Sequence, residues 1–229
     1  MCKDTIFTLK KFDRIYQISL NKAHFLYNCA AIIFGEKMTL IYIHGFGGNG
    51  EGKKAQLFRE YAQQNNYHFI APSLSYVPTL AIKTLEELTE SYRTLGEEVV
   101  YVGSSLGGFY ATYLADKYAT KAALINPAVQ AYETLSKVIT QGKNYFDGSY
   151  FEWNSGHIKM LENYHVDNID TANFFLLVQT ADEVLDYTFA VTKFKGSKQL
   201  IEQGGDHSFI GIERHFDAIS TFLEISKGV

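Results

Sequence analysis

Short apolar runs rich in β-branched residues alternate along the chain with longer stretches in which apolar residues recur at helical spacing. The runs have the length and composition of buried parallel strands, and they cover residues 39–44, 68–71, 99–102, 121–125, 174–178 and 199–202. Amphipathic helices are predicted in the intervals, at about 55–62, 79–95, 106–118, after 182 and over 212–223.

This alternation predicts an α/β fold with a mostly parallel sheet and helices on both faces. In such sheets, functional groups gather at the carboxyl ends of the strands. The loop 45–48, Ser105, Asp182 and His207 each follow a predicted strand. We therefore expect these positions, which are distant in sequence, to meet at one edge of the sheet.

Residues 1–37 fit the alternation least well. Mixed alternation at 5–9 and 15–20 suits a short hairpin on a sheet edge, whereas the alternative is a peripheral segment with the essential domain beginning at Met38. At 229 residues the chain has the size of one domain. We therefore treat 1–37 as an N-terminal extension and 38–229 as the main domain.

Aromatic residues accumulate between 132 and 164, where the helical pattern loosens. Two interpretations fit this stretch equally well. It forms either a small cap over a pocket or a plain surface loop with buried aromatic side chains.

Charge and composition argue against several functional classes. The net charge of -4, from 21 basic and 25 acidic residues, gives no electrostatic case for a nucleic-acid partner. No apolar run reaches the length of a membrane span. Cys2 and Cys29 form neither a disulfide framework nor a metal or redox spacing, so a cytoplasmic protein with reduced thiols is predicted.

The most informative motif is Gly-x-Ser-x-Gly, formed by Gly103, Ser105 and Gly107. A predicted strand runs directly into it, and a predicted helix follows at once, which is the setting of a nucleophile elbow. The turn is tight, so its neighbours must lack bulk, and a β-carbon at either glycine is expected to collide with the adjoining strand or helix. The pattern predicts that Ser105 is a nucleophile exposed at the end of its strand.

A second glycine-rich loop follows the first strand of the main domain. Residues 45–50 satisfy G-x-G-x-x-G, but the next strand ends in Ala71-Pro72-Ser73 without the carboxylate that a dinucleotide fold requires. Residues 47–53 satisfy seven positions of a P-loop, but Lys54 stands where Ser or Thr should bind Mg²⁺. Neither nucleotide-binding interpretation passes its own second test.

The third interpretation is an oxyanion loop, because His44-Gly45-Phe46-Gly47-Gly48 has the composition of the turn that lies opposite a nucleophile elbow. Gly45 and Gly47 allow close approach of the backbone to a substrate oxygen. The backbone amides of Phe46 and Leu106 are the two predicted donors.

A serine nucleophile requires a base, and histidine suits this task because its pKa lies near neutrality. His207 follows Gly204-Gly205-Asp206 and precedes the last helix, where a loop brings an imidazole to the edge of the sheet. His44 is expected to shape the glycine-rich turn. Structural or solvent-facing roles are expected for His24, His68, His157, His165 and His215.

The third group must be a carboxylate between the serine and the histidine in chain order. Asp182 comes directly after a predicted strand and is the favoured candidate. Glu183 and Asp186 compete with it, although helix capping suffices to explain Asp186. Asp206 is an outside candidate.

These motifs agree in order and setting, and they are Tyr42–Phe46, Gly103–Ala111, Asp182–Tyr187 and Gly204–Phe209. In them the chain resembles the α/β-hydrolase superfamily and, more narrowly, the small bacterial esterases of the YqiA-like (UPF0227) family. The resemblance spans residues 38–223 and implies that 38–229 is a catalytic domain of the α/β-hydrolase fold. It implies ester or acyl-thioester hydrolysis by Ser105, Asp182 and His207, without a metal or a nucleotide. Residues 1–37 have no counterpart in that pattern.

The resulting hypothesis is a serine esterase acting on a small-molecule acyl ester or thioester through an acyl-enzyme, without a cofactor. A hydrolase-fold binding protein that has lost turnover is the first alternative. A C–C hydrolase or acyltransferase with the same triad is the second. The sequence gives no oligomeric state.

Overall fold

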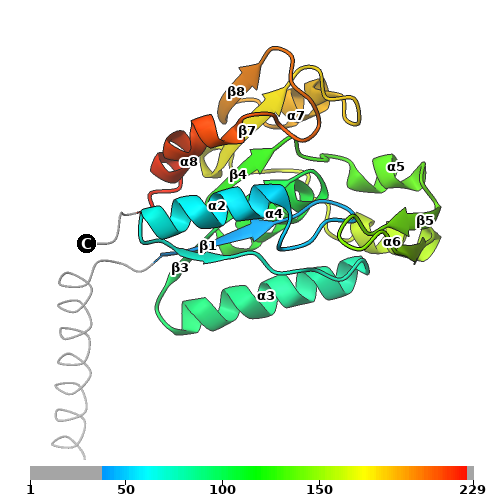
Figure 1. Cartoon of the computed structure of the whole chain (residues 1–229), viewed down its shortest axis with the longest axis horizontal. Helices are drawn as coiled ribbons and strands as arrows, with labels where there is room; N and C mark the ends of the chain where they lie inside the picture. The colour runs from blue at the N-terminus through cyan, green and yellow to red at the C-terminus, as the bar shows by residue number, and fades with distance from the viewer. Residues whose placement is uncertain (1–37, 226–229) are drawn as a thin grey trace, which may run out of the picture. The chain divides into compact units, whose positions relative to one another are not determined.

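A computed structural model describes residues 38–225, and the hairpin predicted within 1–37 lies outside this range. The described residues contain a six-stranded sheet in the order β2-β1-β3-β4-β7-β8, with every neighbouring pair parallel (Figure 1). The strands are β1 (Met38–Ile43), β2 (His68–Ile70), β3 (Glu98–Ser104), β4 (Ala122–Ile125), β7 (Phe174–Gln179) and β8 (Lys198–Glu202). The predicted α/β fold is confirmed.

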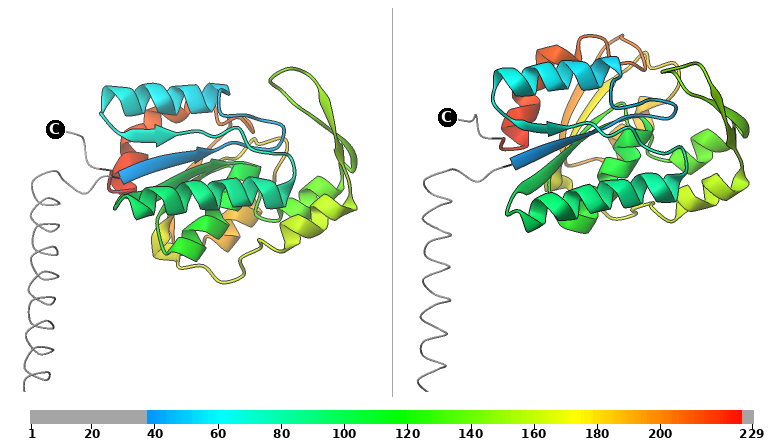
Figure 2. Two further views of the ribbon diagram at one scale, coloured as in Figure 1. Left: turned by 90° about the horizontal axis from the view of Figure 1, so that it is seen from below. Right: turned by 60° about the horizontal axis from the view of Figure 1, so that its bottom comes forward.

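Helices cover both faces of the sheet (Figure 2). One face carries α2 (Lys53–Gln64) and α8 (Phe216–Phe222), and the other carries α3 (Pro78–Thr94), α4 (Leu106–Tyr118) and α7 (Tyr187–Lys193). Strand β3 shows why both faces are covered, because Val99 and Tyr101 pack in one core and Val100 and Val102 in the other. Alternate residues of a strand point to opposite faces of the sheet, so a strand that is apolar at every position is stable only when helices cover both faces.

The end of the chain differs from its sequence pattern. Residues 212–223 are predicted as one helix, but the structure begins with the 3-10 turn η2 (Ile212–His215) before α8. The imidazole Nε2 of His215 lies 2.7 Å from Glu202 Oε1, and this contact ties the turn to β8. No helix among the described residues has both the length and the apolar character needed to cross a lipid bilayer.

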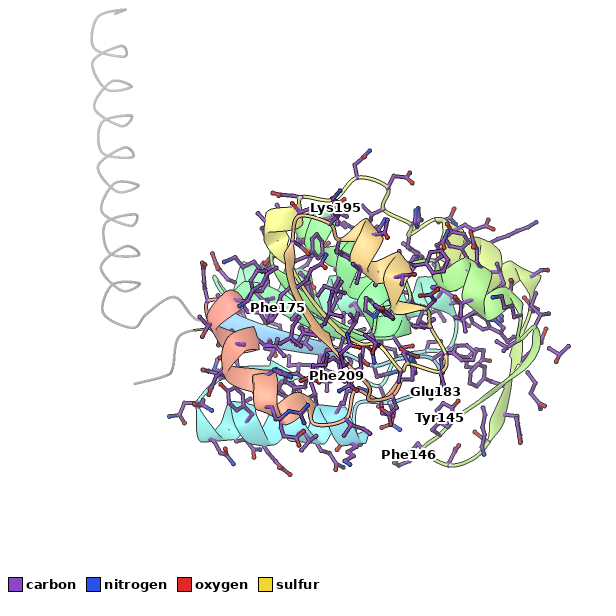
Figure 3. The ribbon with its side chains drawn as sticks, turned by 90° about the horizontal axis from the view of Figure 1, so that it is seen from above. Tyr145, Phe146, Phe175, Glu183, Lys195 and Phe209 are labelled. Atoms are coloured by element: carbon purple, nitrogen blue, oxygen red, sulfur yellow. The ribbon has the colours of Figure 1, made fainter. Side chains whose placement is uncertain are left out.

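The aromatic stretch forms a small substructure inserted between β4 and β7. It consists of α5 (Ala131–Ser136), the antiparallel strands β5 (Thr140–Lys143) and β6 (Tyr150–Trp153), α6 (Ser155–Glu162) and the 3-10 turn η1 (Thr171–Asn173). Trp153 is fully buried, whereas Tyr145 and Phe146 at the hairpin tip are each 72% exposed (Figure 3). The stretch therefore combines a small cap with buried aromatic side chains.

The cap packs on the glycine-rich loop that follows β1. The Phe46 ring meets Trp153 and Phe151 edge-on at centroid distances of 4.8 and 5.4 Å. The backbone N–H of Tyr145 donates to the carbonyl of Gly47 over 2.8 Å. Edge-to-face rings and a backbone hydrogen bond thus fix this loop from the cap side.

Candidate active site

The turn between β3 and α4 holds Ser105 in a strained conformation. Its φ of 56° and ψ of -122° lie in a region that residues with a β-carbon rarely adopt. The Ser105 N–H donates to the carbonyl of Ile125 at 3.1 Å, and its own carbonyl accepts from Gly108 at 2.9 Å and Ala128 at 3.0 Å. These bonds hold the serine side chain at the carboxyl end of the sheet.

The glycines of this turn lie where no side chain fits. A β-carbon on Gly103 would lie 2.8 Å from Ala111 Cβ and nearer still to the carbonyl oxygen of Gly107. One on Gly107 would lie 2.7 Å from the His44 carbonyl oxygen and would overlap that of Ile43. Helix α4 therefore packs directly on the backbone of β1, which fixes the direction in which Ser105 points.

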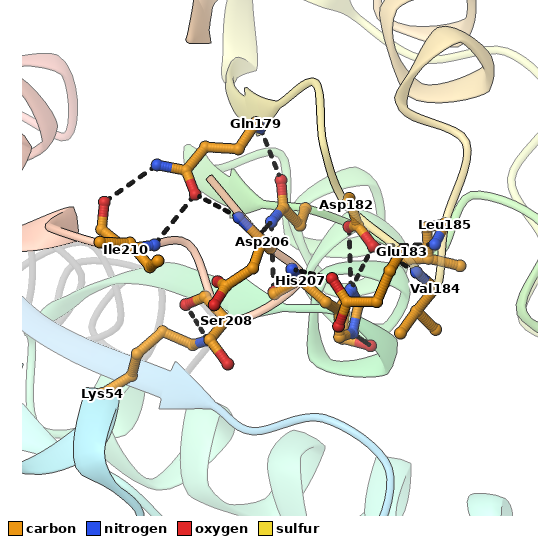
Figure 4. A network of polar contacts seen from close by, with 12 residues as sticks. Lys54, Gln179, Asp182, Glu183, Val184, Leu185, Asp206, His207, Ser208 and Ile210 are labelled. Atoms are coloured by element: carbon orange, nitrogen blue, oxygen red, sulfur yellow. Dashed lines mark hydrogen bonds and ion pairs between the residues drawn. The ribbon is translucent and has the colours of Figure 1, made fainter. Parts of the chain in front are cut away.

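Three loops bring a hydroxyl, an imidazole and a carboxylate together. Nε2 of His207 lies 3.0 Å from Ser105 Oγ, and its Nδ1 lies 2.8 Å from Asp182 Oδ2 and 3.0 Å from Oδ1 (Figure 4). Ser105 follows β3, Asp182 follows β7 and His207 follows β8. The chain of hydrogen bonds can pass a proton from the hydroxyl to the imidazole while the carboxylate orients the ring.

Asp182 is built as a buried anion. Its side chain is 2% exposed, and the amides of Val184 and Leu185 donate to Oδ1 over 2.8 and 2.9 Å. Burial raises the pKa of this carboxyl, but the hydrogen bonds from His207, Leu185 and Val184 together outweigh burial and leave its pKa below the ordinary value. Asp182 therefore keeps its negative charge beside the imidazole at neutral pH.

The competing carboxylates have other surroundings. Glu183 accepts the backbone N–H of His207 at 3.0 Å, and Asp186 caps α7 by accepting the N–H of Thr188 at 2.9 Å. The carboxylate of Asp206 has no hydrogen-bond partner among the described residues. Of the four acidic side chains considered from the sequence, Asp182 is the one that meets the His207 ring.

His44 has a structural environment. Its Nε2 accepts the Leu74 N–H at 3.0 Å, so the ring proton lies on Nδ1, which donates to the Gly45 carbonyl at 2.8 Å. Burial lowers the pKa of His44, so the ring stays neutral near neutral pH. The remaining described histidines bond elsewhere, namely His68 to Glu97, His157 to Asn154, His165 to Asp167 and His215 to Glu202.

The glycine-rich loop lies against the serine. A β-carbon on Gly45 would come within 3.0 Å of Ser105 Cβ, and Gly47 has a φ of +69°. Within residues 38–225, neither the Phe46 amide nor the Leu106 amide donates to another protein group. One free backbone donor thus lies in the loop against the serine and the other directly follows the serine, and both can bind an oxygen atom of a ligand.

A buried glutamine, which the sequence analysis did not select, holds the His207 loop. The Oε1 of Gln179 accepts the N–H groups of Asp206 at 3.1 Å and Ile210 at 2.9 Å. Its Nε2 donates to the Ile210 carbonyl at 2.9 Å (Figure 4). The same nitrogen donates to Glu202 at 2.8 Å. The loop that carries His207 is therefore fixed on both sides of the histidine.

Asn126, which directly follows β4, holds the same His207 loop. Its side-chain N–H₂ donates to the carbonyls of Asp206 and His207 over 3.0 and 3.2 Å, and its Oδ1 accepts the Gln179 N–H at 3.0 Å. Asn126 is 2% exposed and has a φ of 40°. The signal in the sequence is a polar residue directly after each of two apolar runs, 121–125 and 174–178.

Residues 39–224 match the model of a family described as "Uncharacterised protein family (UPF0227)". The chain belongs to this family. Ser105, Asp182 and His207 all lie within the matched residues. Solved structures similar to this UPF0227 chain have the α/β-hydrolase fold.

Three of these solved structures show the extent of the likeness. Est1E from Butyrivibrio proteoclasticus is 14% identical with a TM-score of 0.62, and α/β-hydrolase domain-containing protein 10 from mouse is 20% identical with a TM-score of 0.63. In both cases 82% of this chain and 88% of the other are covered. An esterase from Pyrococcus furiosus is 15% identical with a TM-score of 0.59, covering 85% and 84%. At these identities the likeness establishes the fold.

Two cavities of the UPF0227 chain share the glycine-rich loop as a wall. The wider one, about 750 Å³, is lined by Ser105 and His207 and by the first turn of α2 with Lys54. The smaller one, about 80 Å³, is lined by Phe46 and Leu106 together with apolar side chains, which are Leu74, Tyr110 and Phe151. Both linings mix polar and apolar side chains, since His44, Ser75 and Asn144 also line the smaller cavity. Of the two cavities, Ser105 lines the wider one.

Proposed function

We propose that this protein is a serine hydrolase that cleaves acyl esters or acyl thioesters through an acyl-enzyme. The observation that carries the proposal is the unbroken series of hydrogen bonds from Ser105 through His207 to Asp182. A strained serine at a strand-to-helix turn, with two free amides beside it, is the arrangement that acyl transfer uses. All these groups lie within residues 38–225 and need no cofactor.

In the first half-reaction, His207 Nε2 removes the hydroxyl proton as Ser105 Oγ attacks the carbonyl carbon. The amides of Phe46 and Leu106 donate to the oxyanion that forms, and each such donor typically contributes about 3 to 4 kcal/mol to the transition state. His207 then gives the proton to the departing alcohol or thiol. The acyl group is left on Ser105.

In the second half-reaction, the same imidazole takes a proton from the water that attacks the acyl-enzyme. It then gives this proton to Ser105 Oγ as the acid leaves, which restores the free enzyme. Asp182 keeps the proton of neutral His207 on Nδ1 and stabilises the imidazolium in both steps. Its buried, ionised state supports this role. Glycines 45, 47, 103 and 107 serve the reaction by allowing the backbone to approach the serine.

Two further observations support an acyl ester as the substrate. The smaller cavity beside the predicted oxyanion donors has Leu74, Tyr110 and Phe151 in its wall, which supports an acyl-chain site. The wider cavity, which His207 lines, has room for the alcohol or thiol part. The Pyrococcus furiosus protein with the same fold is named an esterase.

A fluorophosphonate probe tests the proposal directly, because it reacts with an activated serine and not with a retired one. The wild-type protein is expected to be labelled on Ser105 within minutes at neutral pH, with the site read by peptide mass spectrometry. Short-chain p-nitrophenyl esters are expected to compete with labelling. An unlabelled, folded protein would mean a binding module, and labelling at another serine would mean a different nucleophile.

Replacing Gln179 by leucine is expected to lower kcat by about 10- to 100-fold with a much smaller change in KM. The substitution leaves the Asp206 N–H, the Ile210 N–H and the Ile210 carbonyl without their partner, so the loop no longer holds the His207 ring at one position. Ester hydrolysis is measured at a temperature well below the unfolding midpoint. The exposed Gln63→Leu on α2 is the matched control.

A drop in stability of the Gln179 variant with kcat unchanged would contradict the positioning role. The same outcome would reduce Gln179 to a purely structural residue.

A further inference from the structure

Lys54 presents a charge in the wall of the wide cavity. It is the second residue of α2, and its Nζ donates to the carbonyl of Ser208, next to His207, over 2.7 Å. No carboxylate of residues 38–225 lies within 4.0 Å of this ammonium group. An ammonium has three donors, so two N–H groups remain for a ligand in the cavity.

Asp206 lines the same cavity from the opposite loop. Its backbone N–H is held by Gln179, but its carboxylate accepts no hydrogen bond from the described part of the protein, and Oδ1 is buried. Figure 4 shows Lys54 reaching the His207 loop at Ser208, with Asp206 near it. The Asp206 charge acts on Lys54 without a direct ion pair, while burial lowers the pKa of Lys54 to about 8.

The cavity beside Ser105 therefore has, near each other, a donor with two unused N–H groups and an acceptor that has no hydrogen-bond partner among the described residues. A ligand carboxylate or phosphate would bind Lys54 but be repelled by Asp206. A ligand ammonium would bind Asp206 but be repelled by Lys54. An alkyl group would leave the Asp206 carboxylate without a hydrogen bond and Lys54 with the one to Ser208 alone, which is unfavourable in a partly buried site. A hydroxyl satisfies both, because it accepts from Lys54 and donates to Asp206.

We propose that Lys54 and Asp206 form a subsite for a hydroxyl group on the alcohol part of the substrate. The proposal rests on the serine-hydrolase function above and specifies its substrate class as esters of hydroxylated alcohols. The alcohol part is assigned to this side because His207, which protonates the departing oxygen, lies between Asp206 and Ser208, the residue that Lys54 contacts. The two residues act as specificity determinants of the same site.

Pairs of butyrate esters that differ by one atom group test this assignment. The 2-hydroxyethyl, 3-hydroxypropyl and 4-hydroxybutyl esters are compared with the propyl, butyl and pentyl esters, in which a methyl group replaces the hydroxyl. The assay runs at pH 7.0, where Lys54 is mainly protonated. At one spacer length, kcat/KM of the wild-type protein is expected to favour the hydroxyl ester by about tenfold or more.

Lys54→Met and Asp206→Leu are each expected to reduce this preference to less than threefold. The ratio is the decisive quantity, because a variant that merely disturbs the His207 loop lowers both members of a pair equally. Lys83→Met on α3 and Asp116→Leu on α4 are the matched controls. Both replace exposed charges that do not line the wide cavity, and both are expected to keep the wild-type ratio.

Each outcome has one meaning. Hydrolysis of all esters without preference at any spacer length overturns the subsite and leaves the hydrolase function standing. A preference that survives in both variants also overturns it. If the protein cleaves no ester and does not react with fluorophosphonate, the result contradicts the proposed serine-hydrolase function rather than the subsite.

Discussion

Replacing Ser105 by glycine is expected to abolish ester hydrolysis and to raise the free energy of unfolding by about 1 kcal/mol. The activity falls because no other group can form the acyl-enzyme, and loss of a catalytic serine typically costs about 10⁶ in kcat. The stability rises because glycine adopts a φ of 56° and a ψ of -122° without the clash that a β-carbon makes. This one substitution is thus expected to remove activity and to raise stability at the same time, because the hydroxyl serves catalysis while the strained backbone destabilises the fold.

Ser105→Ala is the control, since it removes the hydroxyl and keeps the β-carbon. It is expected to be as inactive as the glycine variant but no more stable than the wild-type protein. Urea unfolding and initial rates on p-nitrophenyl acetate check both parts. Equal stability of the alanine and glycine variants would show that the backbone at residue 105 stores no strain, and residual turnover above 1% would remove Ser105 from the mechanism.

The core of the site could be predicted because its signals are local. Gly103 and Gly107 flank a serine between an apolar run and a helical pattern, and each of these features occupies a few neighbouring residues. Asp182 and His207 required one further step, namely that parallel strands place their carboxyl ends on one edge. The structure brings His207 within 3.0 Å of both Asp182 and Ser105, although 25 and 102 residues separate it from them along the chain.

The groups that hold the site in place were not predictable in this way. Gln179 and Asn126 bond to backbone groups of a loop that begins more than 20 residues further along, and backbone partners leave no mark on side-chain periodicity. The strands of the cap also lack a signal. Thr140–Lys143 has no alternation of apolar and polar residues, yet it pairs with Tyr150–Trp153, whose Trp153 is fully buried.

The residues of the site therefore fall into two groups, those that the sequence identifies and those whose role appears from the structure. Ser105, His207 and Asp182 are recognisable by residue type and order, whereas their distances are set by residues whose role appears in three dimensions alone. The Lys54–Asp206 pair belongs to the group that only the structure identifies. In the sequence, Lys54 stands in a glycine-rich stretch whose spacing matches a P-loop almost completely, and this spacing gives no sign of a contact with the His207 loop. In the folded chain that lysine faces the His207 loop.

Replacing Gly107 by alanine is expected to lower the free energy of unfolding by about 3 kcal/mol or more, a large share of the stability of a typical domain. The added methyl group would overlap the carbonyl of Ile43 and lie 2.7 Å from that of His44, so α4 must move away from β1. Both contacts are backbone atoms, which cannot rotate aside as a flexible side chain does. The shift also moves Ser105 away from the glycine-rich loop, so activity falls with stability.

Gly148→Ala provides the contrast. Gly148 has a φ of +74° with no atom within 4 Å of an added β-carbon, so its substitution tests backbone strain without a clash and is expected to cost about 1 kcal/mol. Thermal and urea unfolding of both variants separate the two causes. If Gly107→Ala proved no more destabilising than Gly148→Ala, the close packing of α4 on β1, which sets the direction of the serine, would be wrong.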